Sequence, residues 1–252
     1  MVRLKNKVAF VTGAASGIGR AEAILFATEG AIVVVADYDL TGAKLVENEI
    51  ADAGGTAVAV EVDVSNRLSA ERAIAGAIGE FGQIDILGLT AGRFDDGRAT
   101  LDTDEELWDQ VFAVNVKGLY YLTNATLPQM IERRTGAIVI VSANSGLLGG
   151  GGGAAYTASK HASIGYARHL SASYGRYGIR TNVVAPGITE TPMAAASLGA
   201  PEVQAMIERL PAGRAAWPEE IAQAALFLAS DAASYLHAIV IPVDGGMMNT
   251  IW

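Results

Sequence analysis

The sequence predicts an α/β fold in which a doubly wound parallel sheet of about seven strands carries helices on both faces. Apolar runs such as 31–36 and 136–141 are continuous rather than alternating, and this pattern is typical of strands that are covered on both sides. Segments with apolar residues at helical spacing separate these runs. Strands that alternate with helices favour right-handed crossovers and a parallel sheet.

The first half of the chain supplies four of the expected strands. Ser65 can cap a helix and Phe81-Gly82 can close it, because a serine satisfies free N–H groups and a glycine leaves the helix readily. In chain order we expect strand 8–11, a helical segment from 21 to 27, strand 31–36, helix 41–53, strand 56–62, helix 66–80 and strand 84–89.

The second half supplies the other three strands and the longest helices. Pro218 fits the first turn of a helix, where its missing N–H costs nothing. In chain order we expect helix 104–134, strand 136–141, a loop with five successive glycines at 149–153, helix 154–177, strand 179–185, an irregular proline-containing segment that ends at 216, helix 218–230 and strand 238–243.

Composition bounds the classes of function. A length of 252 residues with 51% hydrophobic residues suits one domain over 1–252. The net charge of -9 argues against a nucleic-acid partner. The absence of cysteine excludes disulfides and thiol chemistry and fits a cytoplasmic protein. No apolar run is long enough for a membrane span, and the basic start of the chain does not make a signal peptide.

A glycine-rich turn between the first strand and the first helix predicts a phosphate site. Gly13, Gly17 and Gly19 follow the strand 8–11 and open the next helix. Free N–H groups and a helix N-terminus bind phosphate, and glycine lets the backbone approach it closely. The spacing differs from the commoner G-x-G-x-x-G, so the strand–turn–helix context carries the prediction.

An acidic residue at the end of the second expected strand predicts which dinucleotide binds. Asp37 can accept hydrogen bonds from both ribose hydroxyls of an adenosine, and its charge repels a 2′-phosphate. Neither Ser16 nor Tyr38 supplies a compensating cation, so NAD is favoured over NADP. Asp63-Val64 follows the third strand and either contacts adenine or only starts a helix.

A tyrosine and a lysine four residues apart predict acid–base chemistry. Tyr156 and Lys160 face the same side of a helix. An ammonium group beside a phenol favours the phenolate and lowers the pKa of the tyrosine. The pair alone is common on protein surfaces, but here it follows the fifth strand of a nucleotide-binding sheet.

In combination these features resemble the short-chain dehydrogenase/reductase family in its single-domain form, a Rossmann-type fold. The similar segments occur in the expected order over nearly the whole chain: Thr12-Gly13-Ala14-Ala15-Ser16-Gly17-Ile18-Gly19, Asp63-Val64, Ala91-Gly92, Asn115, Tyr156-x3-Lys160, Pro186-Gly187 with Thr189 and Thr191, and Asp244-Gly245-Gly246.

The resemblance implies a role for each matching residue. Tyr156 is implied as the general acid/base, Lys160 as the residue that lowers its pKa and holds the nicotinamide ribose, and Asn115 as the holder of a relay water. Thr189 and Thr191 are implied as contacts to the carboxamide. The implied cofactor-binding set is Gly13, Ser16, Gly17, Ile18, Gly19, Asp37, Asp63, Val64, Thr90, Ala91, Gly92, Tyr156, Lys160, Pro186, Gly187, Thr189 and Thr191.

Two positions depart from the family pattern. Thr90 stands where asparagine usually precedes Ala-Gly, and Ala143 stands where the catalytic serine falls in an ungapped alignment. Ser142 is our first candidate for the missing hydroxyl, with Ser145 on the other side. Neighbouring residues of an extended chain point to opposite faces, so Ser142 can serve only if the chain bulges after the strand.

The remaining polar clusters favour structural interpretations. His161, His169 and His237 are scattered and are assigned structural positions. Asp95-Asp96 is expected in a solvated loop, and the acidic residues of 102–106 at a helix N-terminus. Their spacing does not indicate a metal site.

The leading hypothesis is an NAD-dependent oxidoreductase that interconverts a secondary alcohol and its ketone. We expect an apolar substrate pocket lined by segments 93–97, 143–153 and 188–216, with the apolar residues Phe94, Leu147, Leu148, Met193, Met206 and Trp217. Because Arg93 and Arg214 lie in these segments, an anionic substrate is also compatible with the sequence. The alternative is a nucleotide-binding regulator with impaired chemistry, which Ala143 favours. An epimerase would need a longer chain. The resemblance implies a homotetramer formed through helices 104–134 and 154–177.

Overall fold

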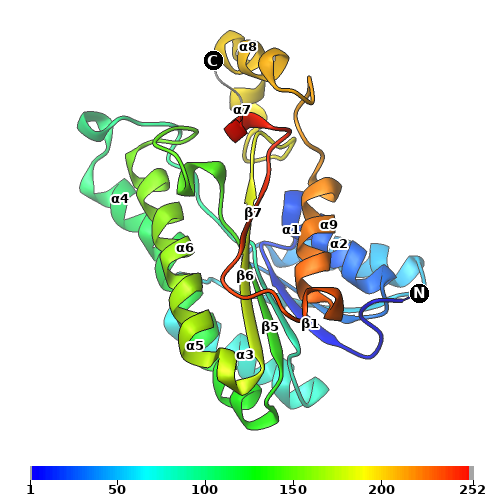
Figure 1. Ribbon diagram of the computed structural model, residues 1–252. Coiled ribbons are helices and arrows are strands. Elements are labelled where there is room, and N and C mark those ends of the chain that lie inside the picture. Colours follow the sequence, from blue (N-terminus) through cyan, green and yellow to red (C-terminus); the bar gives the residue numbers. More distant parts are fainter. Residues whose placement is uncertain (1, 250–252) are drawn as a thin grey trace.

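A computed structural model describes residues 2–249 and confirms the predicted sheet. Over these residues seven parallel strands pair in the order β3-β2-β1-β4-β5-β6-β7 (Figure 1). Burial on both faces explains the continuous apolar sequences of the five interior strands, whereas the edge strands β3 and β7 are only partly buried. The strands are β1 (Val8–Thr12), β2 (Ile32–Asp37), β3 (Thr56–Glu61), β4 (Ile86–Leu89), β5 (Gly136–Val141), β6 (Ile179–Pro186) and β7 (Val240–Val243).

Helices cover both faces of the sheet and bury a separate core on each (Figure 1). Phe26 is fully buried in one core and Leu122 is almost fully buried in the other. One face carries α1 (Gly17–Thr28), α2 (Leu40–Asp52) and α9 (Pro218–Ala229); the other carries α3 (Arg67–Phe81), α4 (Glu105–Phe112), α5 (Gly118–Arg133) and α6 (Ala154–Tyr174).

The structure differs from the predicted elements in three places. Asn66, rather than Ser65, caps α3, and its side chain accepts from the Ser69 N–H at 3.1 Å. The helix expected over 104–134 is interrupted by a π-helical turn, η2 (Ala113–Lys117). The segment expected to be irregular contains α7 (Ala195–Leu198) and α8 (Pro201–Arg209), because Pro201 opens a helix from its first turn.

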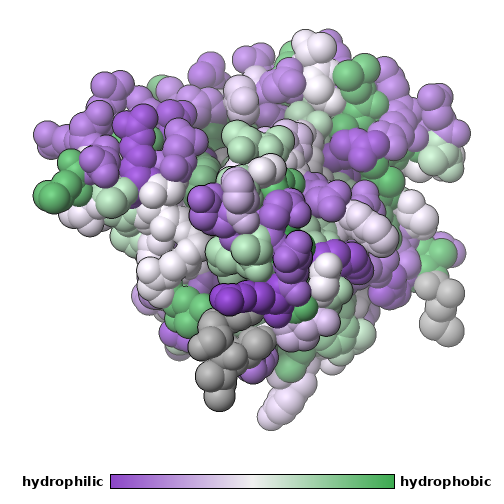
Figure 2. All heavy atoms as spheres, turned by 90° about the horizontal axis from the view of Figure 1, so that it is seen from above, coloured by the Kyte–Doolittle hydropathy of each residue, from purple (hydrophilic) through white to green (hydrophobic). Residues whose placement is uncertain are grey.

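The strand order reverses between β1 and β4, which places a crevice at the carboxyl edge of the sheet. Asp37, Thr90, Ser142 and Pro186 lie at or just after strand ends, so they meet at this edge. Seen from above in Figure 2, the surface mixes hydrophilic residues with smaller hydrophobic patches. Within residues 2–249 no helix is long and apolar enough to cross a membrane.

Candidate active site

A cavity of about 1340 Å³ opens at the carboxyl edge of the sheet. Its walls come from strand ends and from the segments that follow them. The structure brings together every residue that the sequence predicts to bind the coenzyme. These lining residues are Gly13, Ser16, Gly17, Ile18, Gly19, Asp37, Asp63, Val64, Thr90, Ala91, Gly92, Tyr156, Lys160, Pro186, Gly187, Thr189 and Thr191.

The glycine-rich turn is shaped by close backbone contacts. Gly13 has φ +67°, and a Cβ there would lie 2.9 Å from the Cα of Ala91. A Cβ on Gly19 would overlap the carbonyl oxygen of Gly13. The extended Ser16 precedes α1 and makes no capping bond with its side chain. The N-terminus of α1 therefore faces the cavity with open N–H groups, the arrangement that binds phosphate.

One end of the cavity is acidic. The Asp37 carboxylate accepts from the Ala15 N–H at 2.9 Å and from the Asp39 N–H at 3.0 Å, which ties the glycine-rich turn to the end of β2. Glu61 and Asp63 line the same end. One oxygen of Asp63 also accepts from the N–H and the hydroxyl of Ser65, so it shapes a turn as well.

Tyr156 and Lys160 lie one turn apart on α6. The Lys160 Nζ is 5.4 Å from the centre of the Tyr156 ring and donates to the Val141 carbonyl oxygen at 3.1 Å. Burial lowers the pKa of Lys160 to about 8. Burial raises the pKa of Tyr156 well above its usual value, and the charge of Asp95 raises it further. The expectation that Lys160 lowers the Tyr156 pKa is therefore not met here, because desolvation of the phenolate outweighs attraction at this distance.

Asn115 lies in the π-helical turn and joins two other parts of the site. Its Oδ1 accepts from the Arg93 N–H at 2.8 Å, and its Nδ2 donates to the Arg93 carbonyl and to the Ser159 hydroxyl, both at 3.0 Å. Ser159 in turn donates to the Tyr156 carbonyl at 2.7 Å. The Asn115 side chain therefore holds the segment after β4 against α6. Sequence reasoning missed Ser159, although its place directly before Lys160 puts it in the same helical turn.

The Ser142 hydroxyl makes its hydrogen bonds to α6. Its hydroxyl donates to the Lys160 carbonyl at 3.0 Å and accepts from Ser163 at 3.0 Å. Its single proton is thus engaged with α6, and the bulge that would turn it toward a substrate is absent because Ala143 is extended. Ser142 lines the cavity, but its hydroxyl bonds α6, so its contact to a substrate oxygen stays a prediction.

Ser145 is the other hydroxyl beside Ala143, and it lines the cavity. Within residues 2–249 its hydroxyl makes no protein hydrogen bond. A Cβ on Gly151 would lie 3.2 Å from the Ser145 Oγ, and a Cβ on Gly152 would lie 2.5 Å from the Tyr156 Cδ1. Two consecutive glycines therefore border the Ser145 hydroxyl and the Tyr156 ring.

Asp95 does not lie in a solvated loop, as the sequence predicts, but is fully buried. Its carboxylate accepts from the Gly153 N–H at 2.9 Å and from the Tyr156 N–H at 2.8 Å. These partners are far away in sequence, so a local pattern of charged residues could not reveal them. Asp96, its neighbour, is exposed as predicted.

The end of the cavity near Tyr156 is largely apolar. Phe94, Leu148, Met193 and Met206 line it as predicted, and the Phe94 ring meets the Tyr156 ring edge-on at 5.0 Å between centroids. Leu147 and Trp217 are not among the lining residues. Arg214 is paired with Glu220 at 2.6 Å and stacks on Trp217, so it does not offer a free cation there.

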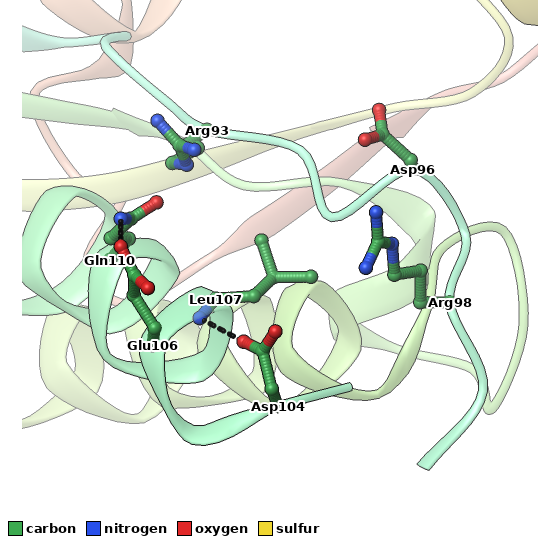
Figure 3. Close-up of a pocket in the computed structure, with 7 residues that line it drawn as sticks. All are labelled: Arg93, Asp96, Arg98, Asp104, Glu106, Leu107 and Gln110. Atoms are coloured by element: carbon green, nitrogen blue, oxygen red, sulfur yellow. Dashed lines mark hydrogen bonds between the residues drawn. The ribbon is translucent and has the colours of Figure 1, made fainter. Parts of the chain in front are cut away.

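Arg93 also borders a separate hollow of about 220 Å³ outside the main cavity (Figure 3). In that hollow Asp104 caps α4 through the Leu107 N–H. Arg93 and Arg98 share it with three acidic residues, so the hollow has no clear preference for an anion or a cation.

The histidines have the predicted structural positions. His161 contacts the Thr157 carbonyl on its own helix, and His237 lies 3.4 Å from the Ser171 hydroxyl. None of the three histidines lines the cavity. Among the described residues there is no group of three or more His, Cys, Asp or Glu side chains that could hold a metal ion.

Glu22 is a fully buried carboxyl directly behind the coenzyme residues. It accepts a short hydrogen bond from the hydroxyl of Thr90, and its other oxygen has no hydrogen-bond partner within residues 2–249. Burial raises the pKa of Glu22 to about 7. The helical spacing of 21–27 places Glu22 on the same face as the buried Phe26, a signal that could have identified it from the sequence.

Comparison with known proteins gives matches over nearly the whole chain. A family model described as enoyl-(acyl carrier protein) reductase matches residues 13–248. The 3-oxoacyl-[acyl-carrier-protein] reductase FabG of Thermotoga maritima is 38% identical, over 98% of this chain and 100% of its own. The D-threitol dehydrogenase of Mycolicibacterium smegmatis is 36% identical, over 97% of this chain and 94% of its own.

Solved structures agree closely with this fold. Levodione reductase has a TM-score of 0.95 at 31% identity, over 99% of this chain and 100% of its own. A Beutenbergia cavernae protein, solved with NADP at low occupancy, has a TM-score of 0.94 at 36% identity, over 99% of each chain.

The buried Glu22 carboxyl predicts a pH dependence of stability. Between about pH 4.5 and pH 7 the unfolded chain loses the Glu22 proton while the folded chain retains it. The free energy of unfolding therefore falls as pH rises through this window, by roughly 3 kcal/mol. Glu22→Gln should remove this decrease when urea unfolding is compared at pH 5 and pH 8. If the free energy of unfolding changes equally between pH 5 and pH 8 in the native protein and in Glu22→Gln, Glu22 is not protonated in the folded state.

Proposed function

The chain belongs to the short-chain dehydrogenase/reductase family, and we propose that within it the protein is an NAD-dependent oxidoreductase that interconverts a secondary alcohol and its ketone. The observation that carries this proposal is the position of Tyr156 and Lys160. They lie where the coenzyme cavity meets an apolar substrate end. The relatives named for threitol and levodione support a secondary alcohol, ketone or cyclic polyol derivative as substrate.

The residues of the cavity fit a dinucleotide. Gly13 and Gly19 leave room at the turn that a Cβ would fill, and α1 offers its N-terminus to a pyrophosphate. Bound NAD would accept the hydride, and its cationic ring would favour the phenolate form of the tyrosine. Thr189 and Thr191 are proposed to hold the carboxamide and Lys160 the ribose.

NAD is proposed rather than NADP because of charge. Asp37, Asp39, Glu61 and Asp63 line the end that would take the adenosine. Among the described residues, the arginine and lysine side chains that line the cavity are Arg93 and Lys160, both at the substrate end. A 2′-phosphate would meet carboxylates without a compensating cation. The similar Beutenbergia cavernae protein was solved with NADP, so the proposal for this chain rests on its own carboxylates.

Tyr156 is proposed to take the proton from the alcohol oxygen during oxidation and to return it to the carbonyl oxygen during reduction. Lys160, already desolvated, would stabilise the phenolate at short range. All polar atoms of the Asn115 side chain are engaged. A relay water at this turn would therefore be held by its main chain.

The second hydroxyl donor is proposed to be Ser145 in place of Ser142. Its hydroxyl lines the cavity beside the glycines that border Tyr156. A substrate oxygen that gains charge in the transition state needs a further donor besides the tyrosine. Ser145 is the candidate whose proton has no other acceptor within residues 2–249.

The whole chain is proposed to act as one dinucleotide-binding domain with a substrate loop over about 188–216. A homotetramer formed through α4–α5 and α6 is proposed from the family resemblance. The half-exposed Tyr120 and the stacked Trp108 and Phe112 on these helices support it. A cytoplasmic location is proposed from the absence of cysteine.

A regulator with impaired chemistry is the second candidate. Ala143 favours it, because the usual hydroxyl is missing at that position. The intact Tyr156 and Lys160 oppose it. A turnover assay with NAD and a panel of secondary alcohols distinguishes the two, since a regulator would bind NAD without forming NADH.

Tyr156→Phe should lower kcat by about 10²–10⁴-fold, because only the hydroxyl carries the proton. NAD affinity, measured by fluorescence titration, should change little. Tyr166→Phe is a matched control on the same helix, since its hydroxyl bonds Thr123 at 2.7 Å away from the cavity. Near-native turnover of Tyr156→Phe would contradict the proposed role.

Asp37→Ala combined with Tyr38→Arg should raise the ratio of kcat/KM for NADP over NAD at least tenfold, about 1.4 kcal/mol. The change removes a repelling charge and adds an attracting one. Tyr38→Arg alone is the control, because it adds the cation without breaking the bonds from Asp37 to the glycine-rich turn. A native enzyme that prefers NADP would overturn the assignment.

Ser145→Ala should lower kcat by about 10²-fold or more, as expected for loss of one donor to a developing oxyanion. Ser142→Ala should leave kcat nearly unchanged and lower the free energy of unfolding by about 1 kcal/mol, since its hydroxyl bonds α6. If Ser145→Ala is silent while Ala143→Ser raises kcat, the site lacks a second donor and Ser145 has no such role.

A further inference from the structure

The segment that leaves β4 contacts three parts of the candidate active site with three consecutive residues. The backbone of Arg93 bonds the Asn115 side chain, and the Phe94 ring packs edge-on against Tyr156. The Asp95 carboxylate bonds the start of α6. One short stretch of chain is therefore in contact with each of the elements that carry the proposed chemistry.

Asp95 supplies the cap that α6 otherwise lacks. The N-cap residue of α6 is Gly153, which has no side chain to satisfy the free N–H groups of the first turn. The two oxygens of Asp95 accept from the Gly153 N–H at 2.9 Å and the Tyr156 N–H at 2.8 Å. A third bond, from the Gly97 N–H at 3.2 Å, fixes the carboxylate itself.

The contact between the two segments is close along its whole length. The Arg98 carbonyl accepts from the Ala154 N–H at 2.9 Å. A Cβ on Gly153 would lie 2.5 Å from the Arg98 nitrogen and 2.6 Å from an oxygen of Asp95. The turn 95–98 therefore holds the first turn of α6 at a fixed distance.

We propose that Asp95 is a positioning residue of this oxidoreductase, whose carboxylate holds the first turn of α6 and thereby places the Tyr156 side chain for proton transfer. This inference rests on the proposed role of Tyr156 as general acid/base. Asp95 does not touch the cavity, so it acts through Tyr156 and not on the substrate.

The charge of Asp95 has a second effect on the same tyrosine. Within residues 2–249 no lysine, arginine or histidine pairs with Asp95, so backbone N–H groups and the helix N-terminus stabilise its charge. The charged groups that face Tyr156 are Asp95 from the segment after β4 and Lys160 from α6. They act in opposite directions on the Tyr156 pKa, which Asp95 raises and an ammonium group lowers.

The test compares Asp95→Asn with Asp96→Asn. Both variants remove one negative charge, but Asp96 is exposed and has φ +56°, a conformation that asparagine tolerates. In Asp95→Asn one acceptor oxygen remains, but the amide nitrogen faces a backbone N–H group, so one of the two bonds that Asp95 makes to the first turn of α6 is lost. The kcat for alcohol oxidation should fall about tenfold or more, and the rising limb of its pH profile should move to lower pH by about half a pH unit or more. KM for NAD should stay within about twofold, and Asp96→Asn should match the native enzyme.

An unchanged kcat and pH profile in Asp95→Asn would overturn the proposal. A variant that loses thermal stability while the rising limb of its kcat–pH profile stays at the native pH would also overturn it. If Asp95→Asn does not fold, Asp95→Glu keeps the charge and displaces the oxygens. Its kcat should fall about tenfold with the pH limb in place, and a native kcat would refute the positioning role.

A separate measurement tests the proposed function: if that function is wrong, the native protein forms no NADH from any alcohol tested. Hydrogen exchange of the amides at 153–156 then decides the positioning role. It should be at least about tenfold faster in Asp95→Asn than in Asp96→Asn, and equal rates would contradict the inference.

Discussion

The position of the site depends on the close approach of two backbone segments where the strand order reverses. Gly13 after β1 meets Ala91 after β4, and only a glycine leaves room for this contact. Thr12 secures it, because its hydroxyl accepts from the Thr90 and Ala91 N–H groups at 3.1 and 3.2 Å. From this contact the chain after β1 turns into the helix that faces the phosphates, and the chain after β4 continues to Asn115 and α6.

Carboxylates in this protein serve two physical purposes according to their surroundings. At the acidic end they line the cavity, where we propose that they favour a ligand that brings hydroxyl groups. Asp95 is buried outside the cavity lining, and its carboxylate accepts hydrogen bonds from backbone N–H groups. Glu22 is also buried, but within residues 2–249 one of its oxygens has no hydrogen-bond partner, and burial raises its pKa.

The sequence predicted the sheet, and the residues that it proposed for coenzyme binding line one cavity, because both depend on local patterns. Continuous apolar runs imply strands covered on both faces, and the glycine-rich turn needs only its own residues. The burial of Asp95 and the bond from Ser142 to α6 were not predicted, because the partners of these residues lie about 60 and 20 residues away. The burial of Asp95 depends on the fold of α6. The hydroxyl direction of Ser142 depends on whether the chain bulges after β5, and a sequence does not specify that geometry.

The five glycines before α6 are identical residues, but the space around them differs. An added Cβ at 149–150 would meet open space, whereas at Gly152 it would meet the Tyr156 ring and at Gly153 the backbone of Arg98. Natural variation should therefore accumulate at the first two positions, where the loop can change its shape and the substrates that it admits. The last two positions should stay fixed, since an added Cβ would overlap Tyr156 at Gly152 and Arg98 at Gly153. A run of identical residues thus joins two positions with open space around them to two positions with none.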